Sequence, residues 1–512
     1  MTTTPLRPQR LNRVSRRVRG FVASPKQRVL WSIGLASALL HLGTMARGSV
    51  FSGSEIIGEM HLLPFSTLRD HPFAALTHLH SQPPMYNLAT ALLLPLPQGV
   101  AAVLVNMVFL FCTVAVAIAA AGMLLDASVR IWLTVTVVVI GVVLDPAFIL
   151  YQTHWSYTLP TAALASLSGW AALRFAMRGT LRSGLAFSLT ATMLILTNSS
   201  FQIYTVVLAT IPLLIRLRSH RRLLLQVFLG PLLVLVCWYG ANFIRYGTTT
   251  TSSWLGMNLA RQTTMFDNRA DLQQLVKSKV LTPIALIRPF NTLHAYASLG
   301  PFPPTGIESL DVAFADGHPN FNDYGYLKIS NAYLDNDLAF IAHRPKAYLV
   351  HVARSLEMWS LPTEQYFPAF SPSRFSFTGW TSLYDKVVNL QKTPDVYATA
   401  QIISNTRPGL GSVSLTALLE TLLAVLVFPV LLFRRRQTSP ALSAGLAWSA
   451  ITTISGFALT SLLEAAENNR FRFELGCLPL IAATLSICWL FQKTRIGPNL
   501  LETSTDETPV PA

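Results

Sequence analysis

Apolar residues occur along this chain in long blocks that are separated by polar segments. An α-helix needs about 20 apolar residues to cross roughly 30 Å of hydrocarbon. By that criterion the sequence predicts about ten membrane-spanning helices, at 29–46, 100–122, 131–150, 157–177, 184–199, 201–217, 222–243, 413–433, 441–463 and 475–491. The expected fold class is an all-α polytopic membrane protein with about ten transmembrane helices.

The basic residues support this interpretation, because they cluster in every second loop. Cytoplasmic loops of membrane proteins are enriched in Lys and Arg, and the segments between predicted spans 2 and 3, 4 and 5, 6 and 7, and 8 and 9 carry such Arg residues. The short outer turn 464–474, with Arg470 and Arg472, is the exception. We therefore expect a multi-pass protein of the cell membrane with both termini in the cytoplasm. The chain is 51% hydrophobic and 12% charged, with a net charge of +15, and this charge indicates contact with the lipid bilayer rather than with nucleic acid.

The blocks divide the chain into five parts. We expect a basic cytoplasmic N-terminus at 1–28, a membrane domain with seven spans at 29–243, an extracytoplasmic segment of mixed structure at 244–412, a membrane domain with three spans at 413–491, and a cytoplasmic tail at 492–512. The stretch 334–359 has helical apolar spacing interrupted at Pro345, which predicts two helices lying against the membrane face. The four cysteines lie in or beside apolar runs, so no disulfide framework is expected.

The first outer loop, 47–99, contains the first candidate chemistry. Glu55 and Glu59 are four residues apart, so a short helix would present both carboxylates on one face. They are candidates for a general base at the membrane surface, and the alternative is a pair of solvated acids on an exterior helix.

The sequence "HSQPPMYN" follows in the same loop. Pro83 and Pro84 predict an extended entry into a short interfacial or re-entrant helix that cannot span the membrane. His80 and Tyr86 are candidates for contact with a phosphate or sugar, although a proline-capped helix start also explains the motif. His154, in the short outer turn "YQTHWS", is a weaker candidate, because a lone histidine in such a turn is more often structural.

Two further segments bring polar groups to the same predicted side. The loop that ends in "GMNLAR" is rich in Gly, Ser and Thr and includes Asn258, so it suits a polar ligand. The segment "EAAENNRFRFEL" places Arg470 and Arg472 beside Glu467. A strand or loop would point both guanidiniums the same way, where they match phosphate oxygens; the alternatives are salt bridges to Glu464, Glu467 or Glu474, or contact with lipid headgroups.

Together these motifs resemble the GT-C glycosyltransferases that use polyprenyl-phosphate sugars, especially the protein O-mannosyltransferase and aminoarabinose transferase branch. The resemblance rests on Ser54-Glu55 followed by "HSQPPMYN", on "ANFIRYG...SSWLGMNL", and on "ENNRFRFELGCLPL". Ser54 stands where the family usually has the aspartate taken as the base. The chain is therefore expected to be a divergent member in which Glu55, or alternatively Glu59, takes that role.

The resemblance implies an inverting transfer of a sugar, on the extracytoplasmic side, from a polyprenyl phosphate to a glycan, glycolipid or protein acceptor. Arg470 and Arg472, with His80, would bind the donor phosphate, and the remaining candidates would support the site: Glu467, Pro83, Pro84, Tyr86, His154 and Asn258. The cofactor is not identified. A divalent cation is compatible with the family, but the sequence offers no metal-ligand set.

Two other classes of function remain open at this stage. A multi-pass transporter would suit the span count, but transport substrates bind near the membrane midplane, whereas the charged candidates collect at one face. A non-catalytic scaffold or flippase accessory of cell-envelope assembly would account for Ser54.

Overall fold

The computed structural model describes residues 24–51, 60–216, 220–363, 378–391, 413–433 and 440–493. These residues are mostly helical, and the strands among them are the two-residue pair β1 (Phe314–Ala315) and β2 (His318–Pro319). The predicted all-α class is therefore confirmed for the described part of the chain. Glu55 and Glu59 lie outside the described residues.

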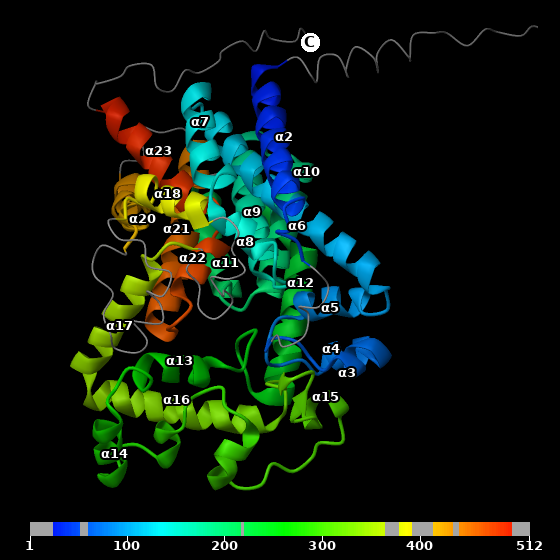
Figure 1. The fold of residues 1–512 in the computed structure, drawn as a ribbon. Helices are drawn as coiled ribbons and strands as arrows, with labels where there is room; N and C mark the ends of the chain where they lie inside the picture. The colour runs from blue at the N-terminus through cyan, green and yellow to red at the C-terminus, as the bar shows by residue number, and fades with distance from the viewer. Residues whose placement is uncertain are drawn as a thin grey trace, which may run out of the picture.

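The apolar blocks form the upper part of the molecule in Figure 1. Each of the ten predicted spans contains at least one helix: α2 (Pro25–Met45), α6 (Gln98–Asp126), α7 (Ile131–Val138) with the π-helix η1 (Val139–Val143) and α8 (Pro146–Tyr151), α9 (Thr158–Arg178), α10 (Leu181–Thr197), α11 (Ile203–Arg216), α12 (Arg221–Tyr246), α20 (Leu415–Phe433), α21 (Pro440–Leu463) and α23 (Leu478–Lys493).

Fewer of these helices are long and apolar enough to cross a membrane on their own. Among the described residues three pass that test, at Gln98–Asp126, Arg221–Tyr246 and Gly445–Leu463, and a fourth arises if the bent pair Asn468–Glu474 and Leu478–Cys488 forms one span. The helices α2 and α9 have 21 residues each but do not pass it. Four shorter apolar helices, Ile131–Val143, Leu181–Thr197, Ile203–Ile215 and Leu415–Leu426, have 10–17 residues. At a rise of 1.5 Å per residue, such helices are shorter than the hydrocarbon core.

The third predicted span, 131–150, is broken rather than continuous. A π-helix interrupts it after Val138, and Pro146 starts a new helix whose first turn is capped by Asp145, which accepts a hydrogen bond from the Ala147 N–H at 2.8 Å. The helix α18 (Thr378–Val387) supports this break, because its Tyr384 hydroxyl donates to the Ile140 carbonyl at 3.0 Å.

The polar segment after α12 forms the lower part of Figure 1. Its main elements are α13 (Leu255–Thr263), α14 (Arg269–Lys277), η3 (Pro283–Leu286), η4 (Leu293–Leu299), α15 (Glu308–Asp311), α16 (Gly325–His343) and α17 (Pro345–Trp359). The predicted interruption at Pro345 is confirmed, since α16 ends and α17 begins there. α13 and α16 pack backbone to backbone at Gly256, where a Cβ atom would lie 1.8 Å from the Ser330 carbonyl oxygen.

The segment 47–99 contributes three short helices, α3 (Phe65–Asp70), α4 (Pro72–Thr77) and α5 (Pro84–Leu93). α5 starts as predicted, with Pro83 extended at its N-cap and Pro84 in its first turn. Its 10 residues are too few to span a bilayer.

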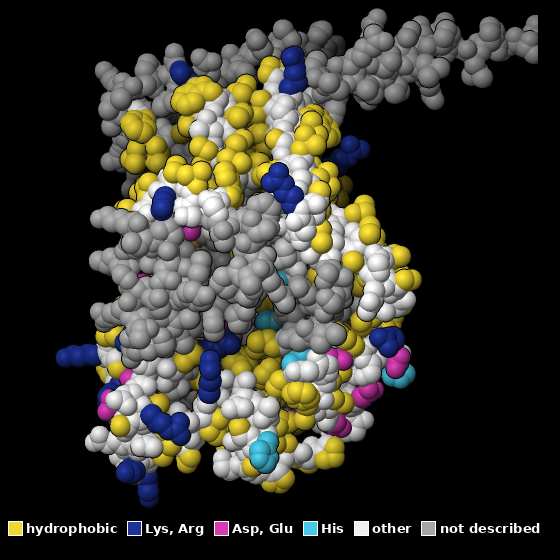
Figure 2. Space-filling model, in the orientation of Figure 1, with side chains coloured by type: hydrophobic (Ala, Val, Ile, Leu, Met, Phe, Trp, Pro, Cys, Tyr) yellow, Lys and Arg dark blue, Asp and Glu magenta, His cyan; other side chains and the backbone are white. Residues whose placement is uncertain are grey.

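The surface follows the same division. In Figure 2 hydrophobic side chains dominate the upper part of the visible face, and most of its acidic and histidine side chains lie in the lower part. The predicted site residues Asn258, Glu467 and Arg470 come together at the border between the two parts.

Candidate functional site

A cavity of ≈ 120 Å³ lies at this border and is lined by segments that are far apart in the chain. The segment 47–99 supplies Met60, His61 and Gln82, and the turn before α11 supplies Ser199, Ser200 and Gln202. The segment before α13 supplies Thr250, Ser252 and Trp254, and α13 itself supplies Asn258 and Arg261. The loop after α21, with α22 (Asn468–Glu474), closes the cavity with Glu464, Glu467 and Arg470.

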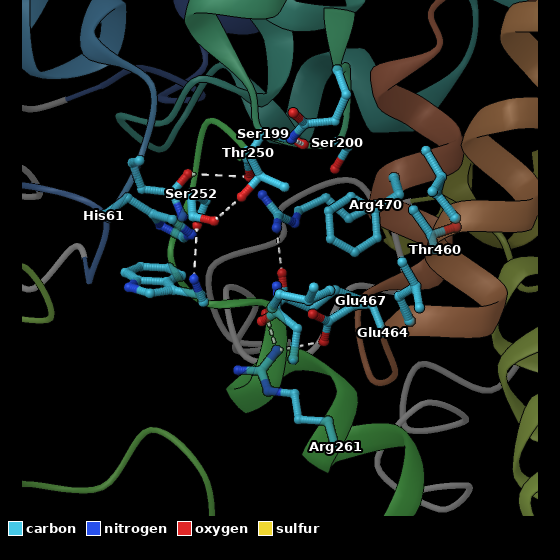
Figure 3. Close-up of a pocket in the computed structure, with 18 of the residues that line it drawn as sticks. His61, Ser199, Ser200, Thr250, Ser252, Arg261, Thr460, Glu464, Glu467 and Arg470 are labelled. Atoms are coloured by element: carbon cyan, nitrogen blue, oxygen red, sulfur yellow. Dashed lines mark hydrogen bonds and ion pairs between the residues drawn. The ribbon is translucent and has the colours of Figure 1, made fainter. Parts of the chain in front are cut away.

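Two arginines reach Glu467 from opposite sides of the cavity wall (Figure 3). Arg470 donates through Nη2 to one carboxylate oxygen of Glu467, and Arg261 donates through Nη1 to the other at 3.1 Å. Arg261 Nη1 also donates to Glu464 at 3.0 Å, and Arg470 Nη1 donates to Glu474 at 3.1 Å. The five side chains form one connected network of charges.

The charges of this network are set by burial and by the neighbouring cations. Burial opposes ionisation of Glu467, but Arg470 and Arg261 outweigh it and lower the pKa of Glu467 to about 2. For Glu464 burial is the larger effect and raises the pKa to about 7, although Arg261 opposes it. Burial likewise opposes the charge of Arg261, yet the two carboxylates raise its pKa, so the guanidinium stays charged.

The opposite wall of the cavity is rich in hydrogen-bonding groups, and its described residues include no Asp, Glu, Lys or Arg. In Figure 3 the Ser252 and Thr250 side chains lie near His61, and Ser199 and Ser200 lie above them. The Tyr157 hydroxyl connects the two walls, because it lies 3.3 Å from His61 Nε2 and 3.2 Å from Arg470 Nη1. Trp254 packs against His61 with a centroid distance of 5.5 Å, so aromatic surface is also available to a ligand.

Local sequence explains how the glutamates and Arg470 come together. Ala466 has a φ of 83°, which turns the chain sharply between α21 and α22, and the Asn468 amide donates to the Thr460 and Glu464 carbonyls across that turn. At the other end Gly476, with a φ of 59° and the Ser166 side chain 2.2 Å from an ideal Cβ, lets α22 meet α23 at a bend of 71°.

The expectation that Arg470 and Arg472 point the same way is wrong. The segment is a helix, not a strand or loop, and two residues along a helix are about 200° apart around its axis. Arg470 lines the first cavity, whereas Arg472 lines a second one and donates to the Leu361 carbonyl at 2.8 Å. The salt bridges of Arg470 to Glu467 and Glu474, an alternative at the sequence level, are present.

His80 lies outside the first cavity wall and is fully buried. Its Nδ1 is 2.8 Å from the Ser253 hydroxyl, and its backbone N–H donates to Asn322. Burial lowers the pKa of His80 to about 3, so its ring is neutral at neutral pH. The structure therefore gives His80 a place between loops, where it carries no positive charge for a phosphate.

The other predicted residues are distributed around the cavity. Asn258 and Glu467 line it. Tyr86 lies behind the wall, where its hydroxyl donates to the Trp155 carbonyl at 2.8 Å and its ring meets Tyr157 edge-on. Pro83 and Pro84 fix the start of α5, and His154 is half-buried in the turn before α9, outside the lining of either cavity.

Sequence reasoning missed Arg261 and His61. Arg261 is the last residue of the "GMNLAR" segment, and its position three after Asn258 places the two on one face of a helix. His61 directly follows Met60 and the segment that carries Glu55 and Glu59. Both signals were available, but neither identifies a partner without the fold.

Among the described residues no group of three or more His, Cys, Asp or Glu side chains is arranged to hold a metal ion. No known family model, curated protein or solved structure matches the chain.

Proposed function

We propose that this protein is a membrane glycosyltransferase that transfers a sugar from a polyprenyl phosphate to an envelope acceptor on the extracytoplasmic side. The proposal includes about ten spans, cytoplasmic termini, and a glycan, glycolipid or protein as acceptor. One observation carries it: a polar cavity at the border of the apolar helices joins a fixed arginine–glutamate network to a wall of hydroxyls and aromatic rings.

Arg261 is the cation best placed to meet a donor phosphate. Its Nη1 is held by Glu464 and Glu467, while within the described part of the chain its Nε and Nη2 form no hydrogen bond. A guanidinium fixed on one edge can offer its other edge to phosphate oxygens as two parallel donors. Arg470, whose Nη1 and Nη2 already serve Glu474 and Glu467, would act through Glu467 by keeping that carboxylate in place.

The base would come from the first outer loop. Glu59 directly precedes Met60 and His61, which line the cavity, and Glu55 lies four residues earlier. In the proposed reaction the carboxylate takes the proton of an acceptor hydroxyl while that oxygen attacks the anomeric carbon from the face opposite the phosphate. The bond between the anomeric carbon and the phosphate oxygen breaks, the configuration inverts, and polyprenyl phosphate leaves with the negative charge, which Arg261 stabilises.

The sugar would lie against the wall opposite the glutamates. Hydroxyl and amide groups of Ser200, Ser252 and Asn258 are suited to sugar hydroxyls, and the aromatic ring of Trp254 suits the apolar face of a sugar ring. Precise placement of the two reactants supplies much of the rate in such a transfer.

The test is transfer from a radiolabelled polyprenyl-phosphate sugar in membranes that contain the full chain. We expect Glu59→Gln or Glu55→Gln to lose about 10²–10⁴-fold in rate, and Arg261→Lys, which keeps the charge but loses the fork, to lose about 10²-fold. Glu308→Gln is the matched control, because Glu308 is exposed, does not line the cavity, and as glutamine keeps an acceptor oxygen for the Thr67 hydroxyl. Full activity in both carboxylate variants would remove the proposed base, and solute movement into liposomes without a covalent product would favour a transporter.

A further inference from the structure

A second cavity, of ≈ 280 Å³, lies on the other side of α22. Apolar side chains make up about half of its lining, among them Ile140 of η1, Phe148 of α8, Val388 just after α18, Phe473 of α22 and Leu480 of α23. Threonine hydroxyls and the Asn389 amide are interspersed among them. This combination of walls suits an amphiphile, with an apolar chain and a polar head, better than a sugar.

Among the described lining residues, three are Asp, Glu, Lys or Arg: the acids Asp145 and Glu420 and the base Arg472. Glu420 is the one charged residue in the apolar helix α20. Within the described part of the chain its carboxylate has no hydrogen bond and no ion pair within 4.0 Å, although the charge of Arg472 acts on it. A carboxylate in such a helix is costly unless it has a function or a partner.

The other two side chains, Asp145 and Arg472, form hydrogen bonds with backbone groups of the protein. Asp145 accepts the Ala147 N–H at 2.8 Å, and Arg472 donates to the Leu361 carbonyl at 2.8 Å. Among the described lining residues two carboxylates therefore face one guanidinium, which is a formal excess of one negative charge in a lining that is about half apolar. A cationic group on a ligand would balance this excess, whereas an anionic group would meet two carboxylates.

The wall next to these charges is irregular in a way that is frequent at functional sites. The π-helix η1 lines the cavity, and π-helical turns inside α-helices are rare and often lie at such sites. Its shape is held from outside by α18, since Tyr384 donates to the Ile140 carbonyl at 3.0 Å and the Trp380 indole donates to the Leu144 carbonyl at 3.1 Å. Hydrogen bonds from α18 therefore fix the wall of this cavity in its irregular conformation.

We propose that the second cavity binds an amphiphile that carries a primary ammonium group, with Glu420 as its anionic anchor. The ammonium would lie between Glu420 and Asp145, with threonine hydroxyls as further acceptors, and the hydrocarbon chain would lie against the apolar lining. This site is separate from the proposed transfer site, because α22 stands between them with Arg470 on one side and Arg472 on the other.

The experiment uses the full chain in lipid nanodiscs and three photoreactive probes with the same alkyl chain: a primary alkylamine, an alkanol and an alkyl phosphate. After irradiation, labelled peptides are mapped by mass spectrometry. We expect the amine to label peptides from α20 and from the α22–α23 bend at least about tenfold more than the alkanol, as for a charge-assisted hydrogen bond. Glu420→Gln should abolish this preference, and Glu420→Asp should retain part of it.

Matched measurements keep the proposal falsifiable. Glu308→Gln, an exposed acid outside the cavity, should label like the unmodified protein. Each variant is also checked by size-exclusion elution and thermal unfolding, so that a misfolded variant is not scored as a loss of binding. Equal labelling by amine and alkanol, unchanged labelling of folded Glu420→Gln, or preferred labelling by the alkyl phosphate would each overturn the proposal, and the last result would assign the cavity to an anionic lipid.

Discussion

Glu467 is the side chain whose replacement would test the arginine–glutamate network most directly. It is 8% exposed and accepts hydrogen bonds from both Arg470 and Arg261. Glu467→Gln keeps the size and one acceptor oxygen but removes the charge that both guanidiniums share. The variant therefore isolates electrostatics from packing.

The expected cost follows from what each arginine retains. Removing one partner of a buried ion pair costs about 3–5 kcal/mol, because the other charge is left uncompensated. Here Arg470 keeps Glu474 and Arg261 keeps Glu464, so neither is left without a carboxylate. We expect a loss at the lower end of that range, about 3 kcal/mol in the free energy of unfolding.

Equilibrium unfolding in mixed micelles would measure this change, with Arg470→Gln and the double variant completing a cycle. The sum of the stability losses of the two single variants should exceed the loss of the double variant by about 1–3 kcal/mol, as for charges in direct contact. Glu308→Gln, at the surface, should change stability by less than about 0.5 kcal/mol. A Glu467→Gln variant as stable as that control, or a cycle in which the losses simply add, would contradict the network.

Because of Glu467, we also expect the stability of the fold to depend on pH in the acid range. The pKa of Glu467 is lowered to about 2 from its ordinary 4.5, since the arginines outweigh burial. A lowered carboxyl pKa stabilises the fold above the unfolded-state value, and this contribution is lost as pH falls from about 4.5 towards 2. The Glu467→Gln variant should lack this part of the acid transition, and an identical acid profile would argue against the ion pairs.

Three further predictions concern packing, burial and topology. Gly256→Ala, which would clash with α16 backbone, should destabilise the protein by about 3 kcal/mol or more and weaken sugar transfer, whereas Gly240→Ala, with nothing within 4 Å of its Cβ, should be neutral or stabilising in thermal unfolding. Burial raises the pKa of Asp337 from 3.8 to about 8, so the fold loses stability as pH rises from about 4 to 8; Asp337→Asn should flatten this slope in pH-dependent unfolding, and an unchanged slope would exclude Asp337 as its source. In a cysteine-free background, a cysteine at the exposed position of Asp335 should react with an impermeant thiol reagent added outside cells, and one at Lys26 should not; the reverse result would invert the proposed topology.

The helical architecture could be predicted because its signal is local. Apolar blocks, Pro83 and Pro84 before α5, and Pro345 between α16 and α17 each act on the residues next to them. The lengths of the membrane helices were less predictable. Val139–Val143 turns into a π-helix because of what packs around it, including the hydroxyl of Tyr384 from far along the chain, and hydropathy contains no information about such a contact.

The candidate site was predicted only as a set of separate motifs. Glu467, Arg470 and Asn258 were found because charged and amide groups beside apolar runs are unusual. Arg261 was overlooked, because its importance comes from Glu464 and Glu467, which lie some two hundred positions away. The burial of His80 beside Ser253 and Asn322, which lowers the pKa of its ring to about 3, likewise depends on residues far along the chain.

The largest difference between the sequence-based prediction and the structure concerns the seven residues of α22. Alternation of Arg470, Phe471, Arg472 and Phe473 has the period of a strand, and a strand would have placed both guanidiniums in one cavity. The chain instead forms a helix between the turn at Ala466 and the bend at Gly476. In a helix the same alternation places Arg470 and Arg472 on opposite sides, so α22 lines one cavity on each side. The two proposals made for this protein, a sugar-transfer site and a site for a cationic amphiphile, both depend on that change of period.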